Sequence, residues 1–564
     1  VQNWLAKPVK GPQFSPGTSA STPREEPDAP APEDFSNYQP RPIPCGPDAP
    51  TNDDFAEVRL KWLRRISIDL YRDTGMRDPR WDDEGEALLE AYAEINGCQP
   101  DKPTVAEYVK LAEAAVEAEC PDPLVRMAAG IAFFRAKRHE DAYDNIFVQP
   151  EKSHPDYPEI AMIPGDCTGW QLHCKLNPDK NQYIEGSYEA FGNLLLTGLE
   201  ETELQGQEPR ALYHWLEHMM DVMAKHRRLA LADRLRELED NENVDQWLVH
   251  TILGYLELMT AWDYRGTSFA SEVSEQGWKD FKKHVPKARR HLVAAWKLHP
   301  DWPEPAGLMV QVITSERGAD PAGRAWFDRA VAGEMDFTYA YAALLNQLLP
   351  RWGGSHEQMW ALAEECMETK RYDTIVPFMG LEIAIDIIKF DAATDFVGRP
   401  DVYDGLTEMF NGYLGASESY WEPEVVKTCW VGIAYYVGKY DTVISLLDDL
   451  GEDVNSTRLQ ELDLTLFEMR RDAAIARSGQ SPHLKAAESA RAAGDYDGAA
   501  GHYRTVLAAS PSDTVAAAAR GGLRAAQIEE AFRAGRSVDL VPGLRPEECT
   551  YVTGRWEVTD DGAL

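Results

Sequence analysis

The chain has 564 residues, of which 57 are basic and 94 acidic, so its formal net charge at pH 7 is −37. This length exceeds what one compact core holds and predicts several domains or an extended repeat array. The strong negative charge repels phosphate groups, which disfavours nucleic acid and anionic membrane surfaces as partners and favours basic proteins or cations.

The first 54 residues differ in composition from the rest of the chain. Prolines are concentrated there among Ser, Gly and acidic residues, and apolar side chains are few and scattered. Such a segment cannot bury enough apolar surface to fold alone, so 1–54 is predicted to be an extended tail. We expect Trp4 and Phe14 to bind separate pockets along a surface of this chain or of a neighbouring subunit. Cys45 is a candidate for a disulfide to a helix.

Helical periodicity begins at about residue 55. Phe55, Val58, Trp62 and Ile66 recur at the helical spacing, which predicts helical hairpins over 55–147. Residues 148–182 contain five prolines and two close cysteines, which predicts a long inserted loop. The helical pattern resumes over 183–478 and predicts a central helical repeat region. No window approaches the roughly 18 consecutive apolar residues of a membrane-spanning helix.

The stretch 479–540 resembles a tetratricopeptide repeat. Gly494 and Tyr496 are placed to form its turn, and the second helix has a packing stripe. The stripe consists of Ala499, Tyr503 and Val506. A weaker copy occurs around Gly438 and Tyr440. The final residues, 541–564, alternate enough to predict a short hairpin or an extended tail.

The middle of the chain contains a second set of distinctive residues. Arg265-Gly266 and Gly277-Trp278 precede LHPDWPEP at 298–305 and LLPRWGGS at 348–355. This region, roughly 260–372, resembles a bacterial family of tetratricopeptide-like proteins of unknown function. The resemblance implies a helical repeat fold and no particular activity. The predicted fold is therefore all-α, an α-solenoid of tetratricopeptide-like hairpins with an extended Pro-rich N-terminal tail.

The motif HWLEHMM is the strongest hint of catalysis. His214, Glu217 and His218 have the H-x-x-E-H order of inverted zinc metalloproteases, and HWLEHM resembles the HFLEHM box of the pitrilysin-type proteases. That family implies a zinc hydrolase and requires a further Glu ligand, yet 276–303 contains no Glu where one is expected. The motif also fits one long amphipathic helix, whose apolar stripe is Leu212, Leu216, Met219, Met220 and Met223. We predict that the histidines lie on its solvated face, with zinc hydrolysis as the alternative.

Two further segments have metal-ligating residue types. Cys167, His173 and Cys174 could hold a metal, but the even count of eight cysteines favours a local Cys167–Cys174 disulfide. Cys98 and Cys120 are predicted not to pair, because a helix separates them.

The stretch 177–189 is similar to a calcium-binding loop. Asn177, Asp179, Asn181 and Glu185 supply oxygen ligands, but Gln182 and Tyr188 occupy the positions at which an EF-hand needs Gly and Glu. A looser calcium site is the alternative there, and no cofactor is otherwise predicted.

The tryptophans of the central region are mostly expected in the core. Trp302 or Trp352, if exposed, would anchor a partner, with Arg351 beside Trp352 in a glycine-containing turn. Because no complete catalytic motif is present, we predict a non-catalytic interaction scaffold or structural subunit of a bacterial assembly. It would bind other protein subunits or copies of itself. An assembly factor or adaptor is the alternative among binding proteins. The cysteine count and the start at Val1 favour an extracytoplasmic location, with the cytoplasm as the alternative.

Overall fold

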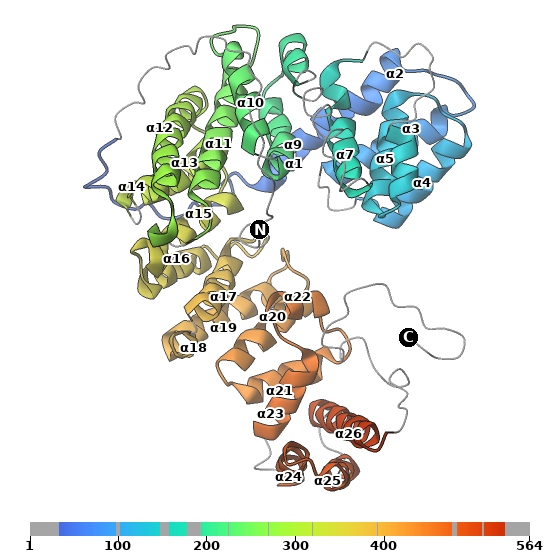
Figure 1. The fold of residues 1–564 in the computed structure, drawn as a ribbon, viewed down its shortest axis with the longest axis vertical. Coiled ribbons are helices and arrows are strands. Elements are labelled where there is room, and N and C mark those ends of the chain that lie inside the picture. Colours follow the sequence, from blue (N-terminus) through green and yellow to red (C-terminus); the bar gives the residue numbers. More distant parts are fainter. Residues whose placement is uncertain are drawn as a thin grey trace. The chain divides into compact units, whose positions relative to one another are not determined.

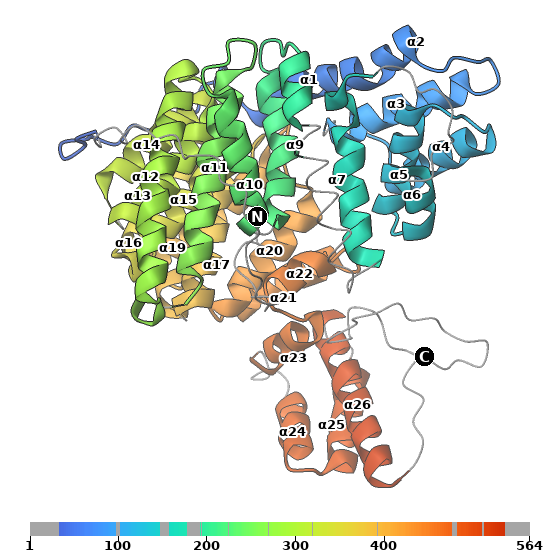
Figure 2. The same cartoon turned by 45° about the horizontal axis from the view of Figure 1, so that its top comes forward.

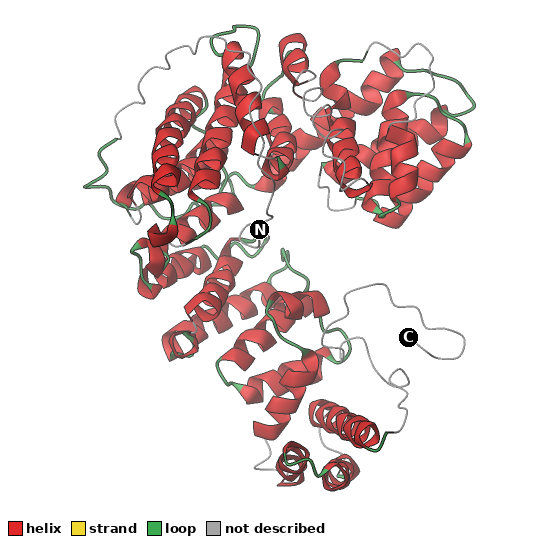
Figure 3. Cartoon of the chain, in the orientation of Figure 1, coloured by secondary structure: helices red, strands yellow, loops and turns green. Residues whose placement is uncertain are grey.

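The structure is a computed structural model, and it describes residues 33–97, 102–146, 157–176, 192, 195–223, 225–268, 270–317, 320–391, 393–476, 482–509 and 513–535. Every regular element in these ranges is helical, and they contain no β-strand (Figure 3). The prediction of an all-α solenoid is confirmed, because consecutive helices pack against their neighbours along the chain. The chain divides into two compact units, Val1–Gly354 and Ser355–Leu564.

The first unit begins with helices that pack in chain order (Figure 1). Its elements are α1 (Asn52–Arg64), the π-helical turn η2 (Arg65–Asp69), α2 (Leu70–Thr74), α3 (Asp82–Asn96), α4 (Val105–Glu117), α5 (Pro123–Arg135), α6 (His139–Ile146), α7 (Glu159–Leu176), α9 (Glu208–Val222), α10 (Lys225–Leu235), η3 (Arg236–Leu238), α11 (Gln246–Arg265), η4 (Ala270–Glu272), α12 (Glu275–Leu298), α13 (Pro303–Arg317), α14 (Pro321–Gly333), α15 (Thr338–Leu348) and η5 (Pro350–Trp352).

Side-chain caps fix the ends of many of these helices. Asp245 accepts a hydrogen bond from Leu248 N at the start of α11, and Ser274 does the same for Gly277 N in α12. Gly266 ends α11 with φ of 70°, a left-handed conformation that costs glycine little. These local rules explain why so many helix boundaries follow from the sequence.

Helices α11 and α12 form the closest pair of the first unit, and α13 packs beside them (Figure 2). The α11 side chains Leu248, Ile252 and Leu256 are fully buried, as is Leu292 of α12. Gly254 of α11 allows the close approach, because a Cβ there would lie 2.6 Å from Leu292. These buried contacts hold the two helices close together.

Residues 33–50 contain no helix and lie along α14 of the same chain. The buried Asp328 of α14 accepts hydrogen bonds from Tyr38 Oη at 2.7 Å and from Arg41 N at 2.8 Å. Arg324 Nη2 donates to Arg41 O at 2.7 Å, and Ile43 is buried. This part of the predicted tail therefore packs on its own chain, whereas Trp4 and Phe14 lie outside the described residues.

The second unit is also built from consecutive helices. Its elements are α16 (His356–Glu368), η6 (Val376–Phe378), α17 (Met379–Asp391), α18 (Thr394–Val397), α19 (Pro400–Gly415), α20 (Pro423–Tyr436), α21 (Tyr440–Leu450), α22 (Ser456–Glu461), α23 (Leu466–Ala476), α24 (Pro482–Ala492), α25 (Tyr496–Ala508) and α26 (Asp513–Arg533).

The predicted repeat near the C-terminus corresponds to α24 and α25, against which α26 packs. Gly494 forms the turn with φ of 80°, and the predicted stripe of Ala499, Tyr503 and Val506 is buried. Gly438 forms the equivalent turn before α21, with φ of 72°. The predicted hairpin or tail at 541–564 lies outside the described residues. In the described ranges, no helix has both the length and the apolarity that a membrane crossing needs.

The predicted loop over 148–182 is wrong for much of its length. Residues 159–176 form α7, an 18-residue helix that accommodates Pro164. The Oγ1 of Thr168 donates to the carbonyl oxygen of Pro164 at 2.9 Å. The helix forms despite its proline because one proline within a helix is tolerated where packing supports the helix, and α7 packs against α5.

Candidate functional site

The HWLEH motif lies on α9, which ends earlier than the sequence predicts. The helix stops at Val222, Met223 has an extended backbone with ψ of 134°, and α10 starts at Lys225. Arg228 compensates for the break, because its Nη1 donates to the carbonyl oxygens of Met220 and Met223. The predicted single long helix is therefore wrong.

The apolar side of α9 agrees with the sequence, but its polar side does not. Leu212, Leu216, Met220 and Met223 are buried as predicted, whereas the side chain of Met219 lies outside the described residues. On the other side, His214 Nε2 lies 3.0 Å from Oε1 of Glu304 in α13. The predicted solvated face is only partly correct at His214, because its side chain is 26% exposed and contacts the buried carboxylate of Glu304.

Glu304 belongs to a buried ionic network that joins α9 to α13 and α14. Arg210 Nε lies 2.7 Å from Glu304 Oε1, and Arg210 Nη2 lies 2.7 Å from Glu334 Oε2. The three side chains are at most 6% exposed. The Arg210 guanidinium also lies over the Phe55 ring, with its carbon 4.0 Å from the ring centroid. Two carboxylates thus share one arginine in the interior, and Oε2 of Glu304 is buried there without a hydrogen-bond partner.

The carboxylates of this network favour the protonated, cationic form of His214. Burial opposes its protonation, yet the carboxylates of Glu217 and Glu304 raise its pKa to about 9. Burial likewise opposes ionisation of Glu304, but Arg210 and His214 lower its pKa to about 2. A zinc ligand must offer a neutral nitrogen with a free lone pair. In this arrangement both nitrogens of His214 face carboxylates, Nδ1 lying 3.6 Å from Glu217 Oε2, and the side chain of His218 lies outside the described residues.

The predicted Cys167–Cys174 disulfide is contradicted by α7. Both residues are on this helix, seven positions apart. At 1.5 Å per residue their Cα atoms are about 10 Å apart, beyond the roughly 7 Å that a disulfide spans. The helix also separates the cysteines along its axis, which removes the reason for grouping them as metal ligands. Their side chains, and that of His173, lie outside the described residues.

The remaining cysteine and calcium predictions have mixed outcomes. Cys45 is exposed and forms no disulfide, so the predicted tether to a helix is wrong. Cys120 is a buried free thiol, and burial raises its pKa to about 12. Cys98, which is predicted not to form a disulfide with Cys120, lies outside the described residues. The stretch 177–189, which is similar to a calcium-binding loop, also lies outside them.

The candidate anchor residues are only partly available to a partner. Trp302 is 5% exposed and stacks on His299 with 3.9 Å between ring centroids, so it belongs to the core and cannot serve as an anchor. Trp352 is half-buried against Trp262, 5.9 Å away in an edge-on arrangement. Arg351 is exposed and donates to Asn346 Oδ1 at 3.2 Å.

Several residues of the resemblance segment come together in space. The guanidinium carbon of Arg265 lies 5.5 Å, 5.8 Å and 5.7 Å from the ring centroids of Trp262, Trp278 and Trp352. Arg265 also donates to the carbonyl oxygens of Gly266 and Ser268. Arg265, Trp278 and Trp352, which belong to the distinctive residues of this segment, therefore pack together with Trp262. Their role is to enclose one arginine among three tryptophans, which is a packing role.

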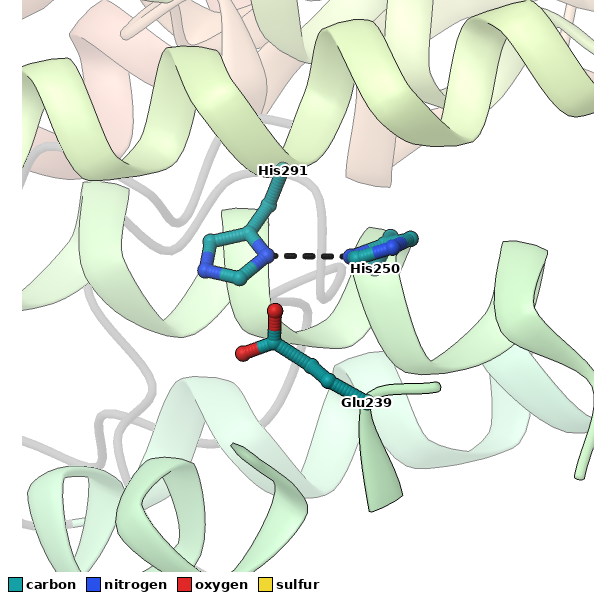
Figure 4. A group of neighbouring side chains, drawn as sticks. All are labelled: Glu239, His250 and His291. Carbon is teal, nitrogen blue, oxygen red and sulfur yellow. Dashed lines mark hydrogen bonds between the residues drawn. The ribbon is translucent and has the colours of Figure 1, made fainter. Parts of the chain in front are cut away.

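The structure reveals a group that the sequence did not predict, which we call the two-histidine group: Glu239, His250 and His291. One ligand atom from each lies within 4.8 Å of the others (Figure 4). Glu239 follows η3, His250 is on α11 and His291 is on α12. The two Nδ1 atoms are 3.1 Å apart. No spacing motif could have found this group, because its members come from three elements and only folding brings them together.

Arg290 fixes the tautomers of the two-histidine group. Its Nη2 lies 2.7 Å from His291 Nε2, and its Nη1 lies 3.5 Å from Glu239 Oε2. Arginine only donates, so His291 Nε2 accepts and the proton of neutral His291 resides on Nδ1. His291 Nδ1–H then donates to His250 Nδ1. Burial and the charge of Arg290 lower the pKa of both histidines, that of His291 to about 2.

Comparison with known proteins found no matching family model and no matching curated protein.

Proposed function

We propose that the chain is a non-catalytic protein-interaction scaffold or a structural subunit of a bacterial assembly, located outside the cytoplasm. The observation that supports this most is the binding of the extended segment 33–50 to α14. There a buried carboxylate, Asp328, receives a tyrosine hydroxyl and a backbone N–H from the segment. A helical array that holds an extended segment of its own chain has the chemistry to hold extended segments of other proteins.

The charge of the chain indicates the partner's chemistry. With a net charge of −37, the surface attracts basic segments and repels polyanions. We therefore expect partners with Lys- or Arg-rich extended or helical segments, and weaker binding as the salt concentration rises. A transient adaptor or assembly factor is the alternative among binding functions, and it differs in releasing its partner.

A zinc hydrolase built on His214, Glu217 and His218 is the enzymatic alternative. For His214 to bind zinc, Glu304 and Glu217 would have to release it, and it would have to lose a proton that its surroundings hold up to a pKa of about 9. Rearrangement of a buried network of this kind is costly, because Glu304 and Glu334 would then rely on Arg210 alone. This cost favours the scaffold.

Chemical cross-linking of the tagged chain in its native source tests the proposal. A structural subunit predicts the same partner peptides cross-linked at a fixed ratio, and an adaptor predicts a ratio that varies with growth conditions. Absence of reproducible partners would contradict both. Metal analysis tests the hydrolase: zinc that is lost in His214→Ala but retained in His250→Gln would support catalysis at the HWLEH motif and contradict the scaffold proposal.

A further inference from the structure

We propose that Glu239, His250 and His291 bind one Zn²⁺ ion, and that Zn²⁺ displaces the Arg290 guanidinium from its place between Glu239 and His291. This site is independent of the HWLEH motif and goes beyond a scaffold function. It would fasten the chain after η3 to the α11–α12 pair.

The spacing of the ligand atoms fits zinc. Zn–N bonds of about 2.0–2.1 Å at tetrahedral angles place two ligand nitrogens about 3.3 Å apart. The Nδ1 atoms of His250 and His291 are 3.1 Å apart, close to this spacing, and both rings must turn so that their lone pairs converge on the metal. A carboxylate oxygen of Glu239 completes a set of three ligands within 4.8 Å of one another (Figure 4).

The ligand types select the cation. Two imidazoles and one carboxylate suit Zn²⁺ and its first-row neighbours, whereas Ca²⁺ and Mg²⁺ prefer sites made only of oxygen. Three protein ligands leave a fourth position for water. His291 is fully buried and the Glu239 side chain is 15% exposed, so packing of α11 against α12 positions the two histidines beside Glu239.

Arg290 in its present position and a bound Zn²⁺ ion exclude each other, because they require different tautomers of His291. To bind zinc through Nδ1, His291 must carry its remaining proton on Nε2. That proton would point at Arg290 Nη2, a donor facing a donor at 2.7 Å. Arg290 must therefore move away, and its charge would in any case repel the metal. The nearby Arg236 needs no such movement, because it pairs with Glu257 and Asp233.

This competition predicts opposite effects of neighbouring substitutions. Arg290→Gln removes the charge and supplies a carbonyl oxygen that accepts from His291 Nε2–H, the second-shell contact typical of zinc-bound histidine. We expect Arg290→Gln to tighten zinc binding about tenfold. His250→Gln and Glu239→Gln each remove a ligand atom and should weaken binding by about tenfold or more.

The experiment is a Zn²⁺ titration of the full chain, stripped of metal, in competition with a chromophoric chelator. The expected result is one tight equivalent per chain, with the three variants ordered as above. His483→Gln is the matched control, because His483 and His502 form another histidine pair, with Nδ1 atoms 3.3 Å apart, that is exposed. The tight equivalent should be unchanged in this control.

Two results would overturn the proposal. One is the absence of a tight equivalent in both the unaltered chain and Arg290→Gln. The other is a tight equivalent that persists in His250→Gln and Glu239→Gln. Visible absorption of the unaltered chain loaded with Co²⁺ guards against variants that fail to fold: intense bands of four-coordinate Co²⁺ support the site, and the weak bands of six-coordinate Co²⁺ contradict it.

Discussion

Arg210 is a buried cation at the centre of an ionic network in the first unit. It stands between Glu304 and Glu334, and all three side chains are almost fully buried. Sequence periodicity could not predict this network, because Glu304 is 90 residues from His214 and polar residues on a helix are normally assigned to its solvated face. The polar side of α9 is partly buried because Arg210 and His214 on this helix pair with the buried carboxylates of Glu304 and Glu334.

Replacing Arg210 should therefore be severe. Arg210→Met removes the guanidinium shared by Glu304 and Glu334, leaving Glu304 beside His214 and Glu334 without this cation, and we expect a loss of about 3–5 kcal/mol in the free energy of unfolding. Denaturant unfolding measures it. Arg138→Met is the matched control, because Arg138 is 39% exposed and its partners Glu113 and Asp141 are 45% and 48% exposed, so its loss should cost at most about 1 kcal/mol. Equal losses in the two variants would contradict the account.

Asp221, one turn after Glu217 on α9, gives a pH-dependent prediction. Burial and the charge of Glu217 raise the pKa of Asp221 to about 7 from its ordinary value of 3.8. Between these values the folded state keeps a proton that the unfolded state has released, so this group lowers stability as the pH rises from about 4 to about 7. Asp221→Asn removes the effect and should stabilise the chain by roughly 1–2 kcal/mol at pH 8, with little gain at pH 4.

Thermal unfolding at the two pH values measures this difference. Glu203→Gln, at an exposed position in the preceding segment, serves as the control and should change stability little at either pH. A gain in Asp221→Asn that is equal at pH 4 and pH 8 would contradict the raised pKa of Asp221.

At the scale of elements, the sequence predicted the turns between helices better than it predicted breaks in the helical pattern. The turn glycines Gly438 and Gly494 are where the sequence places them, because a left-handed backbone favours glycine strongly. The prolines of 148–182, by contrast, suggested a loop where α7 forms. Packing decides such cases, and one sequence does not reveal which helices will be adjacent.

Two glycines of the C-terminal repeat test the role of its turn. Gly494 has φ of 80°, so Gly494→Ala should destabilise the repeat by about 1–2 kcal/mol. Gly501 lies within α25, where an added Cβ meets no atom within 4 Å. Gly501→Ala should stabilise the repeat by up to about 1 kcal/mol. Hydrogen exchange in α24 and α25 would measure both effects. The same sign of change in both variants would contradict the assigned turn.

At the scale of the molecule, the sequence predicted the fold class and missed the group with the clearest metal-binding geometry. Helical periodicity and repeat turns are local properties, so the all-α array was predictable. The two-histidine group depends on how η3, α11 and α12 meet, and the binding of residues 33–50 depends on Asp328 of α14. Both are long-range consequences of packing.

The central claim, that the chain works as part of a protein assembly, is tested most directly by native mass spectrometry of the complex isolated from its source. The sequence accounts for 63.3 kDa. We predict a single dominant species that exceeds the mass of one chain by whole partner subunits and dissociates as salt concentration rises. A dominant species with the mass of one chain, with no bound protein at low salt, would contradict the account.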